Sequence, residues 1–445
     1  MTHSLAGEQA VVIGAGIGGL AAAGALAEHF DRVILFERDV LTDAAISRSG
    51  TPQDKHLHAL MSGGERALSE LFPGFTQDLV TNGAVPLRVG LDIRDERPGF
   101  DPFPVRDLGW SAYALSRPSI ELTLRRRVTK LRNVVLRSGC RVQQILAADD
   151  DRIAGIRYET REGQCEMVPA DLVVDASGRG APTLALLGTL GLAPPEETVI
   201  GVEIHYATAN FAIPPGTLTG WKAVVTRGTV EDGRFGVMSS LEGNRWMVSI
   251  GGRGDVRPPA DIDGFMDYVR RLRTPTIYHA IRDAERLSGI ARYGLTENVR
   301  RHFERLNRFP RGLLPLGDAI CRFNPIYGQG MSVAAMEAGV LHRLLRQRRL
   351  DRAPLADLTS AFLAEAATLI ETPWNLSAIP DFAFPSTRGD RPADLERRLA
   401  LSGAVSRLAA RDPSIHKLML EVQHLLKPPS VYGEPALQQR ILAEI

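Results

Sequence analysis

A glycine-rich turn near the N-terminus has the residue types and spacing to bind a phosphate group. The apolar run Ala10–Ile13 leads into it, and an alanine-rich stretch follows. Here Gly14 permits a tight turn, Gly16 lets a pyrophosphate approach the backbone, and Gly19 lets a helix pack close to a strand. Free N–H groups at the start of that helix then bind phosphate. We therefore predict dinucleotide contacts from a run of six residues: Gly14, Ala15, Gly16, Ile17, Gly18 and Gly19.

A carboxylate lies where the ribose of a dinucleotide is expected. The second apolar run, Val33–Phe36, ends in Glu37, and Glu37 comes 23 residues after Gly14. An acidic side chain at this strand end accepts hydrogen bonds from ribose hydroxyls. Strand, glycine turn, helix, second strand and terminal Glu together favour an adenine dinucleotide. We place Glu37 and its neighbour Arg38 in the binding site.

A later block indicates that the dinucleotide is FAD, bound without a covalent link. The apolar run Leu313–Leu316 ends in Gly-Asp, and a glycine-rich turn then precedes a helix of small residues at 332–338. An Asp at a strand end can bind a ribityl hydroxyl, and a helix N-terminus can direct its positive end at the flavin pyrimidine. An ordinary strand–turn–helix unit explains neither the glycines nor the Asp. The predicted contacts are Gly317, Asp318, Gly328, Gln329, Gly330 and Met331.

A third apolar run ends in Asp175-Ala176-Ser177-Gly178. With the early glycine turn and the late Gly-Asp, this run resembles FAD-dependent monooxygenases of the p-hydroxybenzoate hydroxylase type. The resemblance implies that Asp175 and Gly178 help to bind the cofactor. It also implies that Arg117, just before a predicted helix at 118–131, contacts FAD. The family usually has a longer Asp-Gly signature at the middle site, which bears on contacts to NAD(P)H.

The segment Arg48–His58 carries a closer resemblance. Its pattern R-x-G-x-P-Q-x-x-H-x-H is similar to a loop of bacterial polyene epoxidases that act in polyether biosynthesis, such as those of lasalocid and monensin. The runs Ser116–Pro118, Phe323–Gly328 and Pro373-Trp374 resemble the same group. This resemblance implies that Arg48 and Gln53 bind the cofactor. The candidates near the flavin ring are Pro325, Tyr327 and His56.

Composition excludes several other classes. The 445 residues carry a formal net charge of +1, which argues against bulk electrostatic binding of nucleic acid. Three scattered cysteines, Cys140, Cys165 and Cys321, form no disulfide or zinc pattern, so we expect a cytoplasmic protein with no metal site. No apolar run approaches the length of about 18 residues that a membrane span requires.

The predicted fold class is α/β, with a discontinuous Rossmann-like FAD-binding domain. We expect that domain at 1–85, 105–185 and 290–350, a β-sheet substrate domain at 86–104 and 186–289, and a helical region at 351–445. In the sheet, Val202, Ile204 and Tyr206 alternate with polar or small residues. Tyr206, Phe235 and Trp246 are candidates for either core or pocket, because the sequence does not show which face meets the substrate.

The resemblance implies a monooxygenase reaction. Reduced FAD and O2 would form a flavin C4a-hydroperoxide, and one oxygen atom would pass to an olefin of a lipophilic, polyketide-like substrate. Electrons would come from NAD(P)H or from a separate flavin reductase. No clear general base is evident, which favours an olefin over a phenol. The alternatives are an aromatic hydroxylase, a double-bond reductase and a flavin-bearing binding protein. A halogenase is disfavoured because the segment W-x-W-x-I-P is absent.

Overall fold

A computed structural model describes residues 5–148 and 151–445, and it confirms the α/β class with a Rossmann-like core. The core is a five-stranded parallel sheet in the order β16-β10-β1-β2-β6. Its strands are β1 (Gly7–Ile13), β2 (Phe30–Glu37), β6 (Val134–Ser138), β10 (Leu172–Asp175) and β16 (Leu313–Pro315). Glu37 and Asp175 therefore end strands on either side of β1.

Both faces of this sheet are covered, as a parallel sheet requires. On one face Val12 and Leu35 pack with α1 (Ile17–Ala27) and α8 (Gly330–Gln347). On the other face Val11 and Phe36 pack against a three-stranded antiparallel sheet. That sheet consists of β7 (Arg141–Ala147), β8 (Ile153–Glu159) and β9 (Cys165–Pro169).

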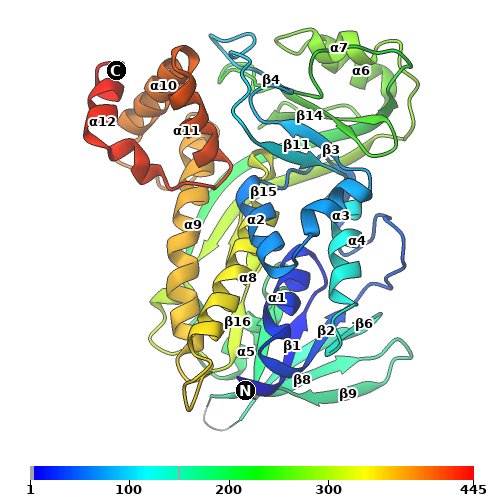
Figure 1. Ribbon diagram of the computed structural model, residues 1–445, viewed down its shortest axis with the longest axis vertical. Helices are drawn as coiled ribbons and strands as arrows, with labels where there is room; N and C mark the ends of the chain where they lie inside the picture. Colours follow the sequence, from blue (N-terminus) through cyan, green and yellow to red (C-terminus); the bar gives the residue numbers. More distant parts are fainter. Residues whose placement is uncertain (1–4, 149–150) are drawn as a thin grey trace.

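Further helices surround the core (Figure 1). They are α2 (Ser62–Leu71), α3 (Phe75–Thr81), α4 (Arg117–Val128) and α5 (Ala181–Thr189). Helix α4 confirms the helix predicted at 118–131 and ends three residues earlier. Its buried side chains Ile120, Leu124 and Val128 share one face and pack toward α1.

The second large sheet has seven strands in the order β17-β15-β11-β14-β13-β12-β4. The long strand β11 (Glu197–Ala212) lies between β14 (Arg245–Arg253) and β15 (Ala291–Arg301). The others are β4 (Ile93–Glu96), β12 (Ala223–Thr226), β13 (Phe235–Leu241) and β17 (Cys321–Arg322). A separate two-stranded sheet joins β3 (Val85–Arg88) to β5 (Ser111–Ala114).

One boundary differs from the sequence analysis. Strands β15 and β17 fall within 290–350, which was assigned to the FAD-binding domain, but they hydrogen-bond in the seven-stranded sheet. Side chains of β15 alternate between the two faces of this sheet. Tyr293 and Leu295 lie opposite residues of β11 on one face, while Arg292, Gly294 and Thr296 are exposed. This period of two is the pattern of a half-buried strand.

The two faces of the seven-stranded sheet have different environments. Trp246, Val248 and Ile250 form a closed core with α6 (Ile262–Arg270) and α7 (Thr276–Ile281). Tyr206 and Phe235 instead join the cluster that includes the FAD-binding core. We call this second face, which carries Tyr206, Thr208, Phe235, Ser249 and Tyr293, the inner face.

The C-terminal region is helical. Helix α9 (Leu358–Phe382) runs beside α8 and reaches the remaining helices near the seven-stranded sheet (Figure 1). These are α10 (Leu395–Arg411), α11 (Pro413–Gln423) and α12 (Pro435–Leu442). No helix in the described parts of the chain is long and apolar enough to cross a membrane.

Candidate functional site

The glycine turn has the geometry that its spacing predicts. Gly14 has a φ of +95°, and a Cβ on Gly19 would lie 1.7 Å from the carbonyl oxygen of Gly14. A side chain at either position would thus disrupt the contact between β1 and α1. A Cβ on Gly16 would meet nothing within 4 Å, and α1 begins there without a side-chain cap. The first amides of α1 are therefore free to bind an anionic group.

Glu37 and Arg48 form the centre of a buried charge cluster at the end of β2. Oε2 of Glu37 accepts a hydrogen bond from the Ala15 amide at 2.9 Å and lies 3.1 Å from Nη1 of Arg48. Oε1 accepts from the Asp39 amide at 3.0 Å. A carboxylate offers about four acceptor sites, so one remains for a ribose hydroxyl. Arg48 is held in place further by Asp39 and Glu121, each at 2.9 Å.

Asp318 lies at the start of α8. A Cβ on Gly330, the first residue of α8, would lie 3.8 Å from Oδ1 of Asp318. Asp318 is exposed by surface area. The surrounding protein nevertheless desolvates its carboxyl and so raises the pKa of that group, while Arg117 and Arg322 act against this shift. Helix α8, like α1, starts without a side-chain cap, and the two helices pack against each other. The Gly-Asp turn and the glycine turn are thereby brought to the same part of the molecule.

Glu337 was not identified in the sequence analysis. This fully buried side chain of α8 accepts a hydrogen bond from the Gly317 amide at 2.6 Å, and its Oε1 has no partner among the described residues. Burial raises the pKa of Glu337 to about 8. It fixes the turn that carries Asp318. The signal in the sequence was a charged residue within the small-residue run Ala334–Ala338.

In the motif Asp175–Gly178, the aspartate has a structural role. The Asp175 carboxylate is fully buried. It accepts hydrogen bonds from the Ser177 amide and from the backbone amide and side-chain hydroxyl of Thr183. Its oxygens thus hold the first turn of α5, and the structure does not bring them to a surface. Gly178 has a φ of +91° with open space around it. The preceding turn packs on Gly14, whose Cβ would lie 2.6 Å from the Ala176 carbonyl oxygen.

The Arg48–His58 loop connects the charge cluster to the inner face. At one end is Arg48; at the other, Nδ1 of His56 is hydrogen-bonded to Thr208 at 2.7 Å. The Leu57 amide donates to Ser249 at 3.2 Å. Burial lowers the pKa of His56 to about 4, so the imidazole is neutral at pH 7. The His56 ring lies 6.0 Å from that of Tyr206 and 5.8 Å from that of Tyr293, between centroids.

Arg117 lies beside this loop, at the start of α4. Its Nη1 is 3.4 Å from Nε2 of His58, and its buried Nε has no hydrogen-bond partner among the described residues. Burial lowers the pKa of Arg117, while Glu121 and Asp318 act against that shift. Arg117 thus lies within electrostatic range of Asp318.

The Phe323–Gly328 run forms a tight turn before α8. The Asn324 side chain caps the short helix Pro325–Tyr327, and Gly328 follows with a φ of +67°. Pro325 is exposed, whereas Tyr327 donates a hydrogen bond to the buried Asp381 of α9 at 2.9 Å. Gln329 and Met331 are buried, and Oε1 of Gln329 has no partner among the described residues.

Unpartnered buried polar atoms test whether this region fits FAD. They include Nε2 of His56, Nε of Arg117, Oη of Tyr206 and Oε1 of Gln329. Such atoms are rare in native proteins, and each calls for a ligand, an ion or water. All four come from elements that the sequence analysis placed around the cofactor or the sheet face. The donor and acceptor set fits a dinucleotide with a polar ring edge.

Arg38 and Gln53, like the other predicted cofactor contacts, remain predictions. Arg38 is exposed beyond β2, and Gln53 is half-buried in the short helix Pro52–Lys55. Within the described residues, no hydrogen bond or ion pair links either side chain to the charge cluster.

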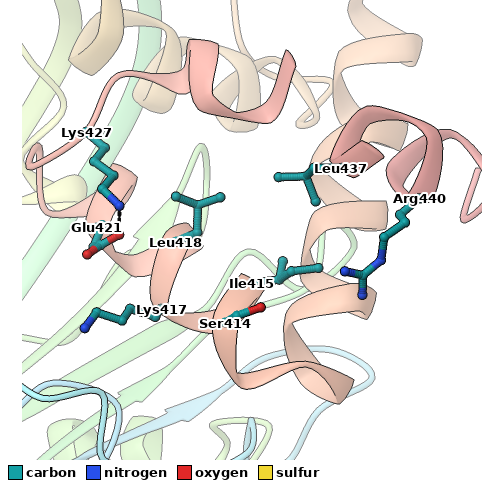
Figure 2. A pocket seen from close by; sticks show the side chains of 8 residues that line it. All are labelled: Ser414, Ile415, Lys417, Leu418, Glu421, Lys427, Leu437 and Arg440. Carbon is teal, nitrogen blue, oxygen red and sulfur yellow. Dashed lines mark ion pairs between the residues drawn. The ribbon is translucent and has the colours of Figure 1, made fainter. Parts of the chain in front are cut away.

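Other features lie away from this site. A cavity of about 350 Å³ lies between α11 and α12, where Ile415, Leu418 and Leu437 face one another (Figure 2). A second, of about 530 Å³, is lined by Trp221 and Trp246. Neither is lined by a predicted cofactor residue.

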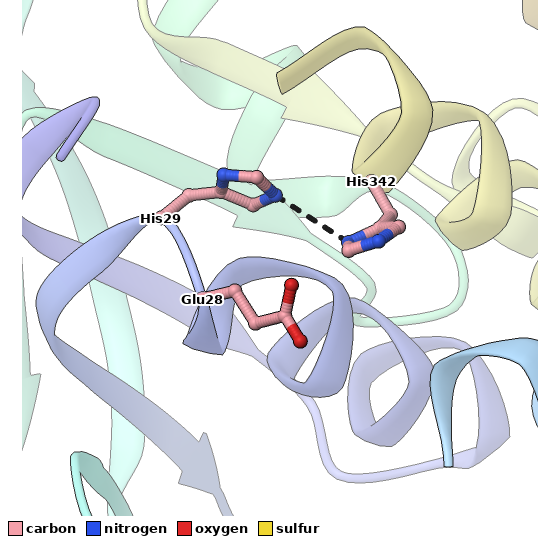
Figure 3. Close-up of side chains that lie close together, drawn as sticks. All are labelled: Glu28, His29 and His342. Atoms are coloured by element: carbon pink, nitrogen blue, oxygen red, sulfur yellow. Dashed lines mark hydrogen bonds between the residues drawn. The ribbon is translucent and has the colours of Figure 1, made fainter. Parts of the chain in front are cut away.

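One group of side chains has the composition of a metal site. Glu28, His29 and His342 lie together, and Nε2 of His29 is 3.4 Å from Nδ1 of His342 (Figure 3). They lie at the C-terminal end of α1, opposite the glycine turn. This group is therefore separate from the flavin site.

Comparison with known proteins decides the family. The model of the FAD dependent oxidoreductase family matches residues 9–187. Protein Rv3254 of Mycobacterium tuberculosis is 33% identical over 411 residues, which cover 87% of this chain and 84% of that protein. The chain belongs to the FAD-dependent oxidoreductase family. FAD is thus its cofactor, as predicted.

Solved structures confirm the fold. The p-nitrophenol 4-monooxygenase PnpA of Pseudomonas putida DLL-E4 is similar with a TM-score of 0.68 and 18% identity, over 95% of this chain and 99% of PnpA. The flavin-dependent brominase Bmp2 is similar with a TM-score of 0.68 and 13% identity, over 98% of each chain. At these identities the likeness is one of fold.

Proposed function

We propose that this flavoenzyme is a monooxygenase that transfers one oxygen atom from O2 to an olefin of a lipophilic small molecule. The second oxygen atom leaves as water, and the two electrons come from NAD(P)H or from a separate flavin reductase. The observation that carries the proposal is the character of the inner face. Aromatic side chains line it, and the histidine that bonds to it, His56, is neutral because burial lowers its pKa.

The inner face offers no strong base among the described residues. Burial lowers the pKa of His56 to about 4 and that of His58 to about 3. Burial also raises the pKa of Tyr206 and Tyr293 above the ordinary value for tyrosine. A phenol has a pKa near 10, so an imidazole of pKa about 4 is a poor base for it. An electron-rich olefin needs no deprotonation.

The chain's own residues would bind, orient and exclude water. When bound, FAD would supply the activation of O2. The glycine turn, Glu37 and Arg48 would hold its adenosine half, and Asp318 and Arg117 would hold its ribityl and phosphate oxygens. Tyr206, Phe235 and Tyr293 would form an apolar wall for the substrate, with ring centroids of Tyr206 and Phe235 5.7 Å apart.

Aromatic hydroxylation is the runner-up, and PnpA, which shares this fold, is named for a phenol substrate. It would require a base that the inner face lacks. A double-bond reductase needs no O2, and a binding protein would form no product. The absence of W-x-W-x-I-P still disfavours halogenation, although Bmp2 has the same fold.

Paired substrates separate these possibilities. The FAD-loaded protein would receive reduced flavin and either a polyene ester or a phenol of similar size, in air or under argon. We expect one oxygen atom added to the polyene in air, no product under argon and no conversion of the phenol. Conversion of the phenol alone would establish the runner-up. A saturated polyene formed under argon would identify a reductase.

A further inference from the structure

The C-terminal helix α9 contacts both ends of the turn that precedes α8. The Trp374 ring packs on Phe323, with centroids 6.5 Å apart, and both side chains are buried. Asp381 follows Trp374 by seven residues, which is two helical turns, and therefore lies on the same side of α9. Asp381 accepts hydrogen bonds from Asn324 and Tyr327.

Asp381 is the acceptor in a buried polar network. Its side chain is fully buried, and it accepts from Arg253 at 2.8 Å, Asn298 at 3.2 Å, Asn324 at 3.0 Å and Tyr327 at 2.9 Å. The donors come from β14, β15 and the turn before α8. One carboxylate thus joins the seven-stranded sheet, the C-terminal region and the predicted flavin-facing turn.

Arg253 supplies the opposite charge. Its guanidinium lies 4.1 Å from the centroid of the Phe384 ring, and its buried Nη1 has no partner among the described residues. A buried ion pair adds little net stability compared with apolar packing, and removing one partner is costly. Its presence here, together with three further donors on one carboxylate, indicates that the network fixes a conformation.

We propose that Asp381 is a positioning residue that holds the Asn324–Tyr327 turn against the flavin ring. This inference rests on the proposed function and on the prediction from the sequence that Pro325 and Tyr327 lie near the flavin ring. The Asn324 amide and the Tyr327 hydroxyl both donate to Asp381, so loss of the carboxylate would remove two of the contacts that fix the orientation of the turn. Helix α9, which the sequence analysis left without a role, thereby becomes part of the flavin site.

The role predicts a selective effect on one half of the cofactor. Loss of the Asp381 contacts should weaken binding of FAD, which reaches the turn, and should spare ADP, which fills only the adenosine half. We expect Tyr327→Phe to lower FAD affinity several-fold and Asp381→Asn to lower it about tenfold or more. Both variants should also alter the visible absorption of the bound flavin.

Titrations of FAD and of ADP into the apoprotein test this inference. Asp381→Asn leaves Arg253 buried without its counter-charge, so Tyr327→Phe, which keeps that pair, is the second variant. Asp390→Asn, an exposed carboxylate beyond α9, is the matched control. Equal loss of FAD and ADP affinity, or unchanged FAD binding and absorption in both variants, would overturn the proposal. These titrations need no turnover, so they remain readable if the wild type fails to epoxidise a polyene.

Discussion

The Glu37 carboxylate lies 3.1 Å from the Arg48 guanidinium and 2.9 Å from the Ala15 amide. This one side chain therefore joins the end of β2 to the glycine turn and to the Arg48–His58 loop. A cofactor that binds at Glu37 would therefore also lie close to the glycine turn and to Arg48.

We predict that Glu37→Gln lowers the affinity for both FAD and ADP by about tenfold, since it weakens the ribose contact and the ion pair with Arg48. Fluorescence titration of the apoprotein measures both affinities. Asp31→Asn, an exposed carboxylate at the other end of β2, is the control and should bind as wild type. Wild-type affinity in Glu37→Gln would remove Glu37 from the ribose site.

Asp318→Ala should separate the two halves of the cofactor. The carboxylate lies beside Gly330 and would accept a charge-assisted hydrogen bond from a ribityl hydroxyl, worth about 1.5–3 kcal/mol. We expect FAD affinity to fall by about tenfold to a hundredfold and ADP affinity to stay unchanged. The same titrations measure this, and a parallel loss for ADP would contradict the ribityl assignment.

Glu337 predicts a pH dependence of stability. Its folded pKa of about 8 lies above the ordinary value of 4.5, so the folded state binds more protons than the unfolded state between these values. The free energy of unfolding should therefore fall as pH rises through this window, by up to about 1.4 kcal/mol per pH unit.

The variant Glu337→Gln cannot ionise and should flatten that slope while keeping an acceptor for the Gly317 amide. Urea unfolding of the apoprotein at about pH 5.5, about pH 7 and about pH 8.5 measures the difference. Identical slopes in wild type and variant would show that Glu337 does not titrate in this range.

The neutral histidines predict a pH-independent oxygen transfer. With the pKa of His56 near 4, the imidazole keeps one protonation state from about pH 6 to about pH 8. Single-turnover measurements with pre-reduced protein should give a constant rate of oxygen transfer over that range. A bell-shaped profile centred near pH 7 would indicate a base that the inner face does not show.

Local patterns in the sequence predict the strand ends and turns that carry the candidate site residues. Glu37 ends a strand, the glycine turn and Asp318 each follow one within a few residues, and parallel strands bring their carboxyl ends together at one edge. Arg117 and His56 were placed by resemblance, and the structure shows both with buried nitrogens that lack partners. The helix at 118–131 was predicted from Pro118, which suits a first helical turn, and from the apolar stripe Ile120, Leu124, Val128 and Leu131.

The rest depends on contacts between distant parts of the chain. Glu337 meets Gly317 across 20 residues, and Asp381 meets Asn324 across 57. The local sequence does not show which residue a buried carboxylate contacts. The apolar neighbours of Asp381 are a sign of its burial, but they do not identify Asn324 as its partner. Asp175 was expected at the cofactor, but its partner Thr183 lies eight residues on and turns it inward.

Labelled oxygen gives the most direct test of the central claim, which is transfer of one atom from O2 to an olefin. The FAD-loaded protein would receive reduced flavin, a simple polyene ester and O2 labelled with heavy oxygen, and mass spectrometry would follow the product. We predict an epoxide that carries one labelled oxygen atom. An unlabelled or saturated product would contradict it.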